Sequence, residues 1–600
     1  MLEAPLPSRL RDASSTQSIG LQPSRALARE WVQRVDSRRR QAAAWSFTAE
    51  AIRGYVEAQG QILGEPLQVS PLQLALTYKL DHFAAEQARS LGRAVASLPL
   101  VQACYQLSAT YTALLPPTLR SAWGAFYTPP ALTDRLLDLA AEAGADWAAA
   151  RVLDPACGGG AFLLPVALRM RAALPKLEPG AFLSHLVTHL HGFEIDPFAA
   201  WLTQVWLETA FAQEVRAASA PFPALVEVCD SLEQHPAASD GFDLVVGNPP
   251  YGRLTLTPAQ RTRYRRSLFG HANLYGLFTD LAVRWTKPGG VLAYVTPTSF
   301  LAGEYFKALR ALLARDAPPL ALDFVTARKG VFEDVLQEAA LTTYRRGGSG
   351  NQATVHYLTV SAESTAAVTE AGRFKLPANP SDPWLAPREP GHQRLVDKIA
   401  HMPARLADWG YGVSTGPLVW NRFKSQLRSR PAKSTFPLIW AEAVTPAGRF
   451  VFRAEKRNHE PYFQVRAVDE WLKVTTSCVL VQRTTAKEQS RRLIAAELPA
   501  AFIAQHGGAV VVENHLNMVR PLDGVPKVSP AAVAAVLNSA AADQAFRCIS
   551  GSVAVSAFEL EALPLPSVAA MRRIEQLIRQ NVGAVAIEAA LQRLYFGRRA

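Results

Sequence analysis

The tetrad Asn248-Pro249-Pro250-Tyr251 combines groups that could hold an aromatic amine. Each proline fixes its own φ angle and lacks a backbone donor, so the turn is stiff and the preceding carbonyls are free to accept hydrogen bonds. The side-chain oxygen of Asn248 and the carbonyl of Pro249 can each accept one N–H of a planar amine. The ring of Tyr251 offers an aromatic face to the group that carries the amine.

Two such acceptors would make the amine a better nucleophile. Its lone pair is otherwise delocalised into the ring, and hydrogen bonds from both N–H groups favour the pyramidal form in which the pair is localised. Placing the nitrogen in line with a sulfonium methyl group would then complete a methyl transfer without a metal ion or a covalent enzyme intermediate. Taken alone, the tetrad could also be only a tight turn.

A glycine-rich segment upstream could bind the methyl donor. Val152-Leu153 runs directly into Asp154–Phe162, which contains three consecutive glycines, and Leu163–Ala173 continues with helix-forming residues. A strand, a glycine-rich turn and a helix in this order let a ligand lie against bare backbone beyond the end of the strand. Glycine triplets are also common in turns that bind nothing.

Two further acids are predicted to lie at strand ends beside this loop. Glu194 ends the next predicted strand, where a carboxylate can accept both hydroxyls of a ribose. It follows Asp154 by roughly twice the ~20-residue interval of dinucleotide-binding units, which disfavours a nicotinamide site. Asp230 ends the strand after that and could accept from an adenine amine, or it could cap the following helix.

Seven predicted strands, alternating with helical stretches over residues 121–347, would bring these groups to one edge of a sheet. The candidates are Arg151–Leu153, Leu190–Glu194, Leu225–Cys229, Phe242–Val246, Val291–Thr296, Ala321–Thr326 and Glu338–Tyr344. This alternation predicts an α/β domain with a mostly parallel, Rossmann-like sheet covered by helices.

Three further regions flank the predicted sheet domain. Residues 1–120 are expected to form a helical extension, because apolar positions recur at helical spacing before Pro116-Pro117. Residues 348–394 are expected to be a linker, since glycines open an irregular, proline-rich passage. Residues 395–600 mix polar strand-like runs with helices and are expected to form an α+β module.

Composition favours a globular protein with a polyanionic partner. Hydrophobic residues make up 49% of the chain and charged residues 19%, and the formal net charge is +12. The same charge would arise if the Arg-rich, Ala-rich composition of the chain only reflects the base composition of its genome. The five cysteines form no Cys-x-x-Cys pair and no run of about 18 apolar residues occurs, so neither a zinc site nor a membrane span is predicted. A soluble, cytoplasmic protein is expected.

In its motif order the sequence resembles the TaqI type of N6-adenine DNA methyltransferases, a group of restriction–modification methylases with a gamma-like arrangement. Cofactor motifs come first, then the catalytic tetrad, then a target-recognition region. The matching stretches are Phe126–Pro130, Val152–Phe162, Gly192–Pro197, Asp243–Tyr251, Asn273–Gly276, Lys287–Gly290 and Val331-Phe332.

The resemblance implies a site-specific, adenine-specific DNA methyltransferase that transfers a methyl group from S-adenosylmethionine to a flipped adenine. Phe332 would be the second aromatic against the base, although a loop phenylalanine anchored in the core would fit the same position. Residues 395–600 would be the target-recognition domain. The residues implied to bind the cofactor are Tyr127, Thr128, Pro129, Asp154, Ala156, Gly158, Glu194, Ile195 and Asp230.

A basic run after the tetrad could contact DNA phosphates. An adenine amine is hidden in the base stack, so the nucleotide must rotate out of the duplex, at a cost of a few kcal/mol. Cations beside the flipped base would help to hold the opened duplex. The same run could instead be a solvated face. The candidates are Arg253, Arg261, Arg263, Arg265 and Arg266.

Two other functions fit the same motifs. A protein glutamine N5-methyltransferase would use the same receptor for a planar amide, but the basic C-terminal region would then have no purpose. The chain could also be a partner-dependent methyltransferase or scaffold subunit of a larger defence complex. The expected partners are double-stranded DNA and, by the resemblance, a cognate restriction endonuclease or defence-system subunits. A monomer is expected on DNA, and no membrane contact.

Overall fold

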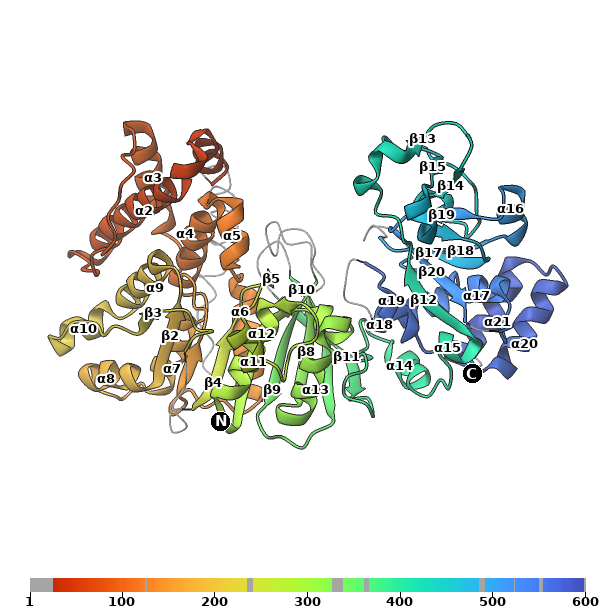
Figure 1. Cartoon of the computed structure of the whole chain (residues 1–600). Helices are drawn as coiled ribbons and strands as arrows, with labels where there is room; N and C mark the ends of the chain where they lie inside the picture. The colour runs from red at the N-terminus through yellow and green to blue at the C-terminus, as the bar shows by residue number, and fades with distance from the viewer. Residues whose placement is uncertain are drawn as a thin grey trace.

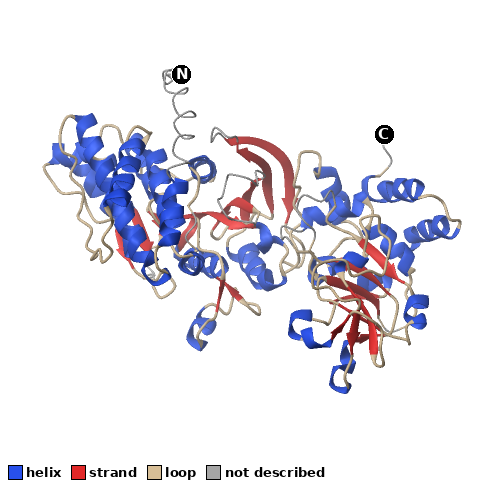
Figure 2. Cartoon of the chain, turned by 90° about the horizontal axis from the view of Figure 1, so that it is seen from above, coloured by secondary structure: helices blue, strands red, loops and turns tan. Residues whose placement is uncertain are grey.

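The computed structural model describes residues 25–124, 127–234, 241–325, 338–360, 366–484, 491–522, 524–549 and 554–597. Figure 1 shows a large part with N-terminal helices and a central sheet beside a separate C-terminal part. From above, the helical bundle, the sheet and the C-terminal part follow one another along the molecule (Figure 2).

A large twisted sheet forms the centre of the first part. Its strands, in the described residues, lie in the order β11-β10-β8-β9-β7-β4-β1-β2-β3. Neighbours are parallel except in the pairs β7–β9, β8–β9 and β10–β11. The strands are β1 (Val152–Asp154), β2 (Leu190–Glu194), β3 (Val226–Val228), β4 (Phe242–Gly247), β7 (Thr286–Pro297), β8 (Pro319–Val325), β9 (Ala339–Arg345), β10 (Gln352–Val360) and β11 (Ala366–Lys375).

The mixed α/β class is as predicted, but the prediction of seven strands is wrong. All seven candidates are present within a few residues of their expected bounds, and β10 and β11 extend the sheet into the predicted linker, 348–394. The glycines there make only a short turn, and β10 then pairs with β8. Its alternating burial is that of a partly covered strand near a sheet edge, a pattern weaker than a continuous apolar run.

Helices cover both faces of the sheet. Val152 and Leu244 belong to the core on one face, whereas the next residues along the same strands, Leu153 and Val245, belong to the core on the other. This alternation is expected of strands buried on both sides. The covering helices are α6 (Pro130–Glu142), α7 (Leu163–Ala173), α8 (Pro179–His189), α9 (Pro197–Ala210), α10 (Ala212–Ala218), α12 (Leu274–Trp285) and α13 (Lys307–Asp316).

The N-terminal helices share a core with this domain. Tyr55 packs edge-on against Trp206 of α9, with ring centroids 5.0 Å apart, and Trp45 lies parallel to the ring of Phe198. The described helices are residues 25–34, α2 (Arg40–Leu63), α3 (His82–Val95), α4 (Leu100–Leu114) and α5 (Pro117–Trp123). The extension is therefore helical, and it is packed onto the sheet domain rather than separate from it.

The C-terminal part contains two sheets with helices around them. One sheet has the order β12-β20-β17-β18 and the other β13-β15-β14-β19-β16. The strands are β12 (Tyr411–Thr415), β13 (Leu427–Arg428), β14 (Thr435–Ile439), β15 (Tyr462–Gln464), β16 (Lys473–Val474), β17 (Cys478–Gln482), β18 (Ala495–Leu498), β19 (Val510–Val512) and β20 (Leu516–Pro521). The helices are α14 (Gln393–Ala400), α15 (Leu406–Trp409), α16 (Ala500–Gln505), α17 (Pro530–Leu537), α18 (Ala540–Ile549), α19 (Ala557–Glu561), α20 (Val568–Arg579) and α21 (Ala584–Phe596).

Two features that would signal another class of protein were not found in the described residues. No helix among them combines the length and the apolar character needed to span a bilayer. No group of three or more histidine, cysteine, aspartate or glutamate side chains among them is arranged to hold a metal ion.

Candidate active site

A cavity of about 220 Å³ lies where the parallel strands β4, β1, β2 and β3 end. The carboxyl ends of such strands meet at one edge of a sheet, where ligands of open α/β proteins usually bind. Of the residues predicted from the sequence, ten line this cavity: Tyr127, Thr128, Asp154, Ala156, Gly158, Glu194, Ile195, Asp230, Asn248 and Pro250. Segments that lie far apart in the chain therefore meet at one place.

The glycine loop takes a shape that only glycine accommodates easily. Gly158 and Gly160 have φ angles of 55° and 91°, in the left-handed region. A Cβ atom on Gly159 would come within 2.5 Å of the hydroxyl of Tyr127 and 2.7 Å of the hydroxyl of Ser108. The triplet thus combines an unusual backbone with close packing on two sides.

Glu194 is buried behind this loop. One of its carboxylate oxygens accepts from the backbone N–H of Gly158 at 2.7 Å, and the other accepts from the N–H of Asp196 at 2.9 Å. Burial nevertheless raises the pKa of the Glu194 carboxyl to about 7. The group is therefore held in place by backbone donors, and its charge changes near neutral pH.

Asp154 adds a second acid at the end of β1. One oxygen accepts from the N–H of Ala156 at 3.0 Å, whereas the other is buried and has no hydrogen-bond partner in the described part of the chain. Burial raises the pKa of the Asp154 carboxyl to about 8, and the nearby charge of Glu194 adds to this shift. A buried acceptor without a partner is costly, so this oxygen suits a ligand that carries donors or positive charge.

Ile195 and Asp230 form the outer side of the cavity. Ile195 is 49% exposed although it directly follows a buried acid, which leaves an apolar surface that a flat ring could cover. Asp230 is exposed, and one of its oxygens accepts from the N–H of Leu232 at 2.9 Å. Asp230 therefore holds a turn at residues 231–233, where the capping interpretation expected a helix, and it also lines the cavity.

The tetrad follows β4 directly, and its asparagine is fixed on both sides. The amide nitrogen of Asn248 donates to the hydroxyl of Thr128 at 3.1 Å, and the hydroxyl of Tyr251 donates to its amide oxygen at 2.5 Å. Thr128 itself is buried. These contacts fix the orientation of the amide group.

The hydroxyl of Tyr251 was not anticipated from the sequence, which predicted only an aromatic face. It also lies 3.2 Å from the carbonyl oxygen of Val295 on β7. Burial raises the pKa of this hydroxyl above its usual range, so it stays protonated and can donate. The ring meets Tyr275 of α12 edge-on, with centroids 6.0 Å apart.

Several predicted residues lie elsewhere. Pro129 does not line the cavity and instead precedes the first turn of α6. Pro249 and Tyr251 belong to the tetrad turn but are not part of the cavity wall. Phe332 falls in the segment 326–337, which lies outside the described residues.

The basic run divides into two groups. Arg266 makes ion pairs with Asp280 at 2.5 Å and Asp316 at 3.4 Å, so it is used within the protein. Arg263 donates to the carbonyl of Gln234 and lies over the ring of Tyr264. The exposed members are Arg253 of β5 (Arg253–Leu254), Arg261 of α11 (Pro258–Arg263) and Arg265; β5 pairs with β6 (Ala272–Asn273).

The sequence did not indicate the part of the cavity wall that comes from the N-terminal helices. Tyr111 and Thr112 of α4 and Trp123 of α5 line the cavity. Their signal in the sequence is that of ordinary apolar helix positions, because the groups they meet lie far along the chain.

Comparison with known proteins gives this site a context. A family model described as Eco57I restriction-modification methylase matches residues 189–332, which include β2, β4 and the tetrad. The Type II methyltransferase M.BsuBI of Bacillus subtilis is 26% identical over 370 residues, covering 60% of this chain and 72% of that protein. M.PstI of Providencia stuartii is 27% identical over 340 residues, covering 55% and 66%. These similarities support the assignment of this chain as a DNA methyltransferase of a restriction–modification system.

A solved structure shows the same fold over nearly the whole chain. The Type IIL restriction-modification enzyme MmeI, in complex with DNA, aligns with 98% of this chain and 93% of its own, at a TM-score of 0.50 and 13% sequence identity. At that identity the likeness concerns the fold alone. Because it spans 98% of the chain, it includes the C-terminal part.

Proposed function

We propose that this chain transfers a methyl group from S-adenosylmethionine to N6 of an adenine that has rotated out of double-stranded DNA. The observation that carries the proposal is the cavity in which the amide of Asn248 meets the two buried acids Asp154 and Glu194. Asn248 suits an amine that is to react, and the two acids suit a ligand with hydroxyl and cationic groups.

The residues around the acids fit S-adenosylmethionine. When bound, that cofactor supplies a methyl group on a positively charged sulfur. Glu194 would accept from the ribose hydroxyls, Ile195 and Asp230 would contact the adenine, and the free oxygen of Asp154 would face the methionine part together with Tyr127 and Thr128. That free oxygen and the raised pKa of both acids favour a ligand with donors and positive charge.

Asn248 would act on the other reactant. With its amide fixed by Thr128 and Tyr251, its oxygen would accept one N–H of the adenine amine, and the carbonyl of Pro249 would accept the other. Both hydrogen bonds strengthen as the nitrogen forms its bond to carbon and becomes positive, so they stabilise the transition state more than the ground state. The ring of Tyr251 would stack on the base, and Phe332 stays a prediction for its other face.

The test of the function is to express the chain in a host that lacks DNA methylation and to sequence the DNA with a method that detects N6-methyladenine. We expect the modification at one short recognition sequence, and none in cells that carry Asn248→Ala. Methylated cytosine, or methylated protein glutamine with unmodified DNA, would refute the proposal. The recognition sequence would also show what residues 395–600 read, since we propose that they form the target-recognition domain.

The exposed arginines after the tetrad should contact phosphates near the flipped base. Arg261→Glu is expected to weaken binding to non-specific duplex and to reduce the slope of log affinity against log salt by about one, since one phosphate contact is lost. Fluorescence anisotropy over a range of salt concentrations measures this. The control is Lys176→Glu, a charge reversal at an exposed residue between α7 and α8. Equal slopes for the two variants would remove Arg261 from the DNA surface.

A further inference from the structure

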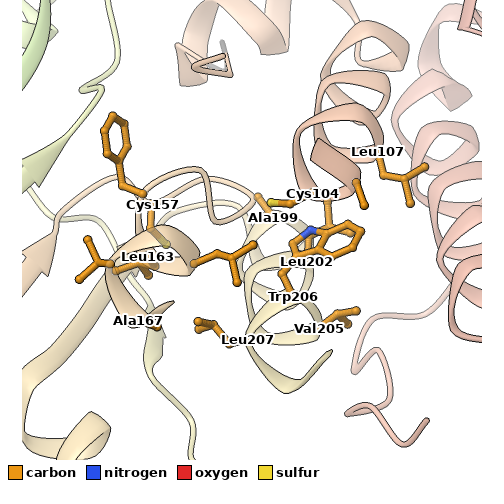
Figure 3. Close-up of a cluster of buried hydrophobic side chains, with 14 of the residues drawn as sticks. Cys104, Leu107, Cys157, Leu163, Ala167, Ala199, Leu202, Val205, Trp206 and Leu207 are labelled. Atoms are coloured by element: carbon orange, nitrogen blue, oxygen red, sulfur yellow. The ribbon is translucent and has the colours of Figure 1, made fainter. Parts of the chain in front are cut away.

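Helix α4 of the N-terminal extension lies directly against the glycine loop. The thiol of Cys104 and the hydroxyl of Ser108 both donate to the carbonyl of Gly159, at 3.3 and 3.2 Å. Figure 3 shows Cys104 and Leu107 of α4 near Leu202 and Trp206 of α9, with Cys157 of the glycine loop on the other side of this cluster. The extension therefore touches the loop that is proposed to bind the cofactor.

Tyr111, one helical turn further along α4, connects the extension to the acids. Its side chain is 1% exposed, and its hydroxyl donates to a carboxylate oxygen of Asp196 at 2.5 Å. The same hydroxyl accepts from the indole nitrogen of Trp45 on α2 at 3.1 Å. Side chains from two helices of the extension, Trp45 of α2 and Tyr111 of α4, are thus connected to Asp196 through the hydroxyl of Tyr111.

Asp196 in turn holds Glu194. Its second oxygen accepts from the N–H of Phe198 and so caps α9, and its own N–H donates to Glu194 at 2.9 Å. The other oxygen of Glu194 accepts from the N–H of Gly158. Hydrogen bonds therefore link Trp45 and Tyr111 to the carboxylate of Asp196, and the backbone N–H of the same residue continues the connection through Glu194 to the glycine loop.

We propose that the N-terminal extension is part of the cofactor site and that Tyr111 is the positioning residue for Glu194, acting through Asp196. The inference rests on the proposed function, since it concerns the affinity for S-adenosylmethionine. Without the hydroxyl of Tyr111, a buried oxygen of Asp196 would lose its donor. The turn at Asp196, whose backbone N–H fixes Glu194, would then be held by the side chain only through its cap on Phe198.

Further contacts hold the N-terminal extension against α9 without touching Glu194 or Asp196. Glu208 of α9 accepts from the N–H of Ser70, and the indole of Trp201 donates to the carbonyl of Ser70. Tyr55 packs on Trp206, and its buried hydroxyl has no hydrogen-bond partner in the described residues. Tyr55 is therefore a matched control, since removing its hydroxyl makes the same chemical change in the same extension.

The experiment is calorimetric titration of S-adenosylmethionine into the full chain, as wild type and as Tyr111→Phe and Tyr55→Phe. We expect Tyr111→Phe to raise Kd by about tenfold, the size of one lost hydrogen bond to a charged group, and Tyr55→Phe to leave it within about twofold. At saturating cofactor, kcat of Tyr111→Phe should stay within about twofold, so the loss appears in KM for the cofactor. Trp45→Phe, which removes the donor to Tyr111 and part of the ring that lies against Phe198, should show a smaller rise of about threefold.

The pH dependence of cofactor affinity distinguishes a positioning role of Tyr111 from a general loss of packing. Burial raises the pKa of Asp196 and the hydrogen bond from Tyr111 lowers it; the other titratable groups around it are Glu194 and Tyr127. Removing the hydroxyl leaves the carboxylate easier to protonate. On acidification, the cofactor affinity of Tyr111→Phe should therefore fall more steeply than that of the wild type, because Asp196 takes up its proton at a higher pH.

The outcomes are distinct. Equal Kd values and equal pH profiles for wild type and Tyr111→Phe would overturn the inference, and so would an equal loss in Tyr55→Phe. If Tyr111→Phe does not fold, Trp45→Phe decides, and an unchanged Kd in that variant counts against the inference. A wild-type chain that binds no S-adenosylmethionine would overturn the proposed function itself, and the inference with it.

Discussion

Asn248→Ala is expected to lower the rate of methyl transfer by a factor of about a hundred to a thousand while leaving the Kd for S-adenosylmethionine within about threefold. The substitution removes an acceptor that is already oriented by Thr128 and Tyr251, and the loss of one such preorganised contact costs about 3–4 kcal/mol in a transition state. The cofactor acids are untouched, so binding of the cofactor should persist.

Single-turnover transfer of a labelled methyl group to duplex DNA measures the effect, with calorimetry for the cofactor. Tyr251→Phe is an informative companion, because it keeps the ring and removes the hydroxyl that orients Asn248; a loss of about tenfold is expected. If Asn248→Ala turns over within about tenfold of the wild type, the amide oxygen does not act on the amine and the proposed role of Asn248 is wrong.

Glu194→Ala is expected to raise the Kd for S-adenosylmethionine by about a hundredfold. The carboxylate would accept two ribose hydroxyls, and each hydrogen bond to a charged group contributes roughly 1.5 kcal/mol or more. The substitution also leaves the N–H groups of Gly158 and Asp196 without the partner that holds the loop. Calorimetry on the folded variant measures the change, and an unaltered Kd would place the ribose elsewhere.

The charge of the two buried acids adds a pH dependence to cofactor binding. The pKa values of Asp154 and Glu194 are raised to about 8 and about 7, so both carboxyls take up protons as the pH falls from 8.5 to 6. Because the ionised forms are the better acceptors, wild-type affinity should decrease over this range. Glu194→Gln should show a shallower decrease, since only Asp154 then titrates. An equally steep decrease in that variant would show that Glu194 is not the titrating group.

The sequence predicted those parts of the site that follow from strand order. A parallel sheet brings the ends of consecutive strands to one edge, so the glycine loop, Glu194 and Asn248 could be placed together without a structure. The contacts that fix them could not be predicted. Tyr111 and Asp196 are 85 positions apart, and their side-chain types are as common in packed helices and caps as in binding sites.

Local sequence patterns also gave wrong or incomplete predictions for segments whose side chains are only partly buried. The glycines and prolines between 347 and 390 suggested a linker. The strands β10 and β11 among them were missed because β10 is only partly buried and β11 is mostly exposed, so neither forms a continuous apolar run. In the basic run after the tetrad, the sequence could not separate Arg266, which pairs with Asp280, from the exposed Arg261. That distinction depends on an acid from α12, which the fold brings alongside.

The position of β10 and β11 determines where such a chain can be recombined. If residues 395–600 are the recognition domain, as proposed, their exchange between relatives would change DNA specificity, and a junction near residue 347 would look natural from the sequence. It would leave the outer edge of β8 with unpaired backbone groups, which invite pairing with other chains and aggregation. A junction after Lys375, between β11 and α14, keeps the sheet whole, so hybrids made there should remain soluble where the earlier cut fails.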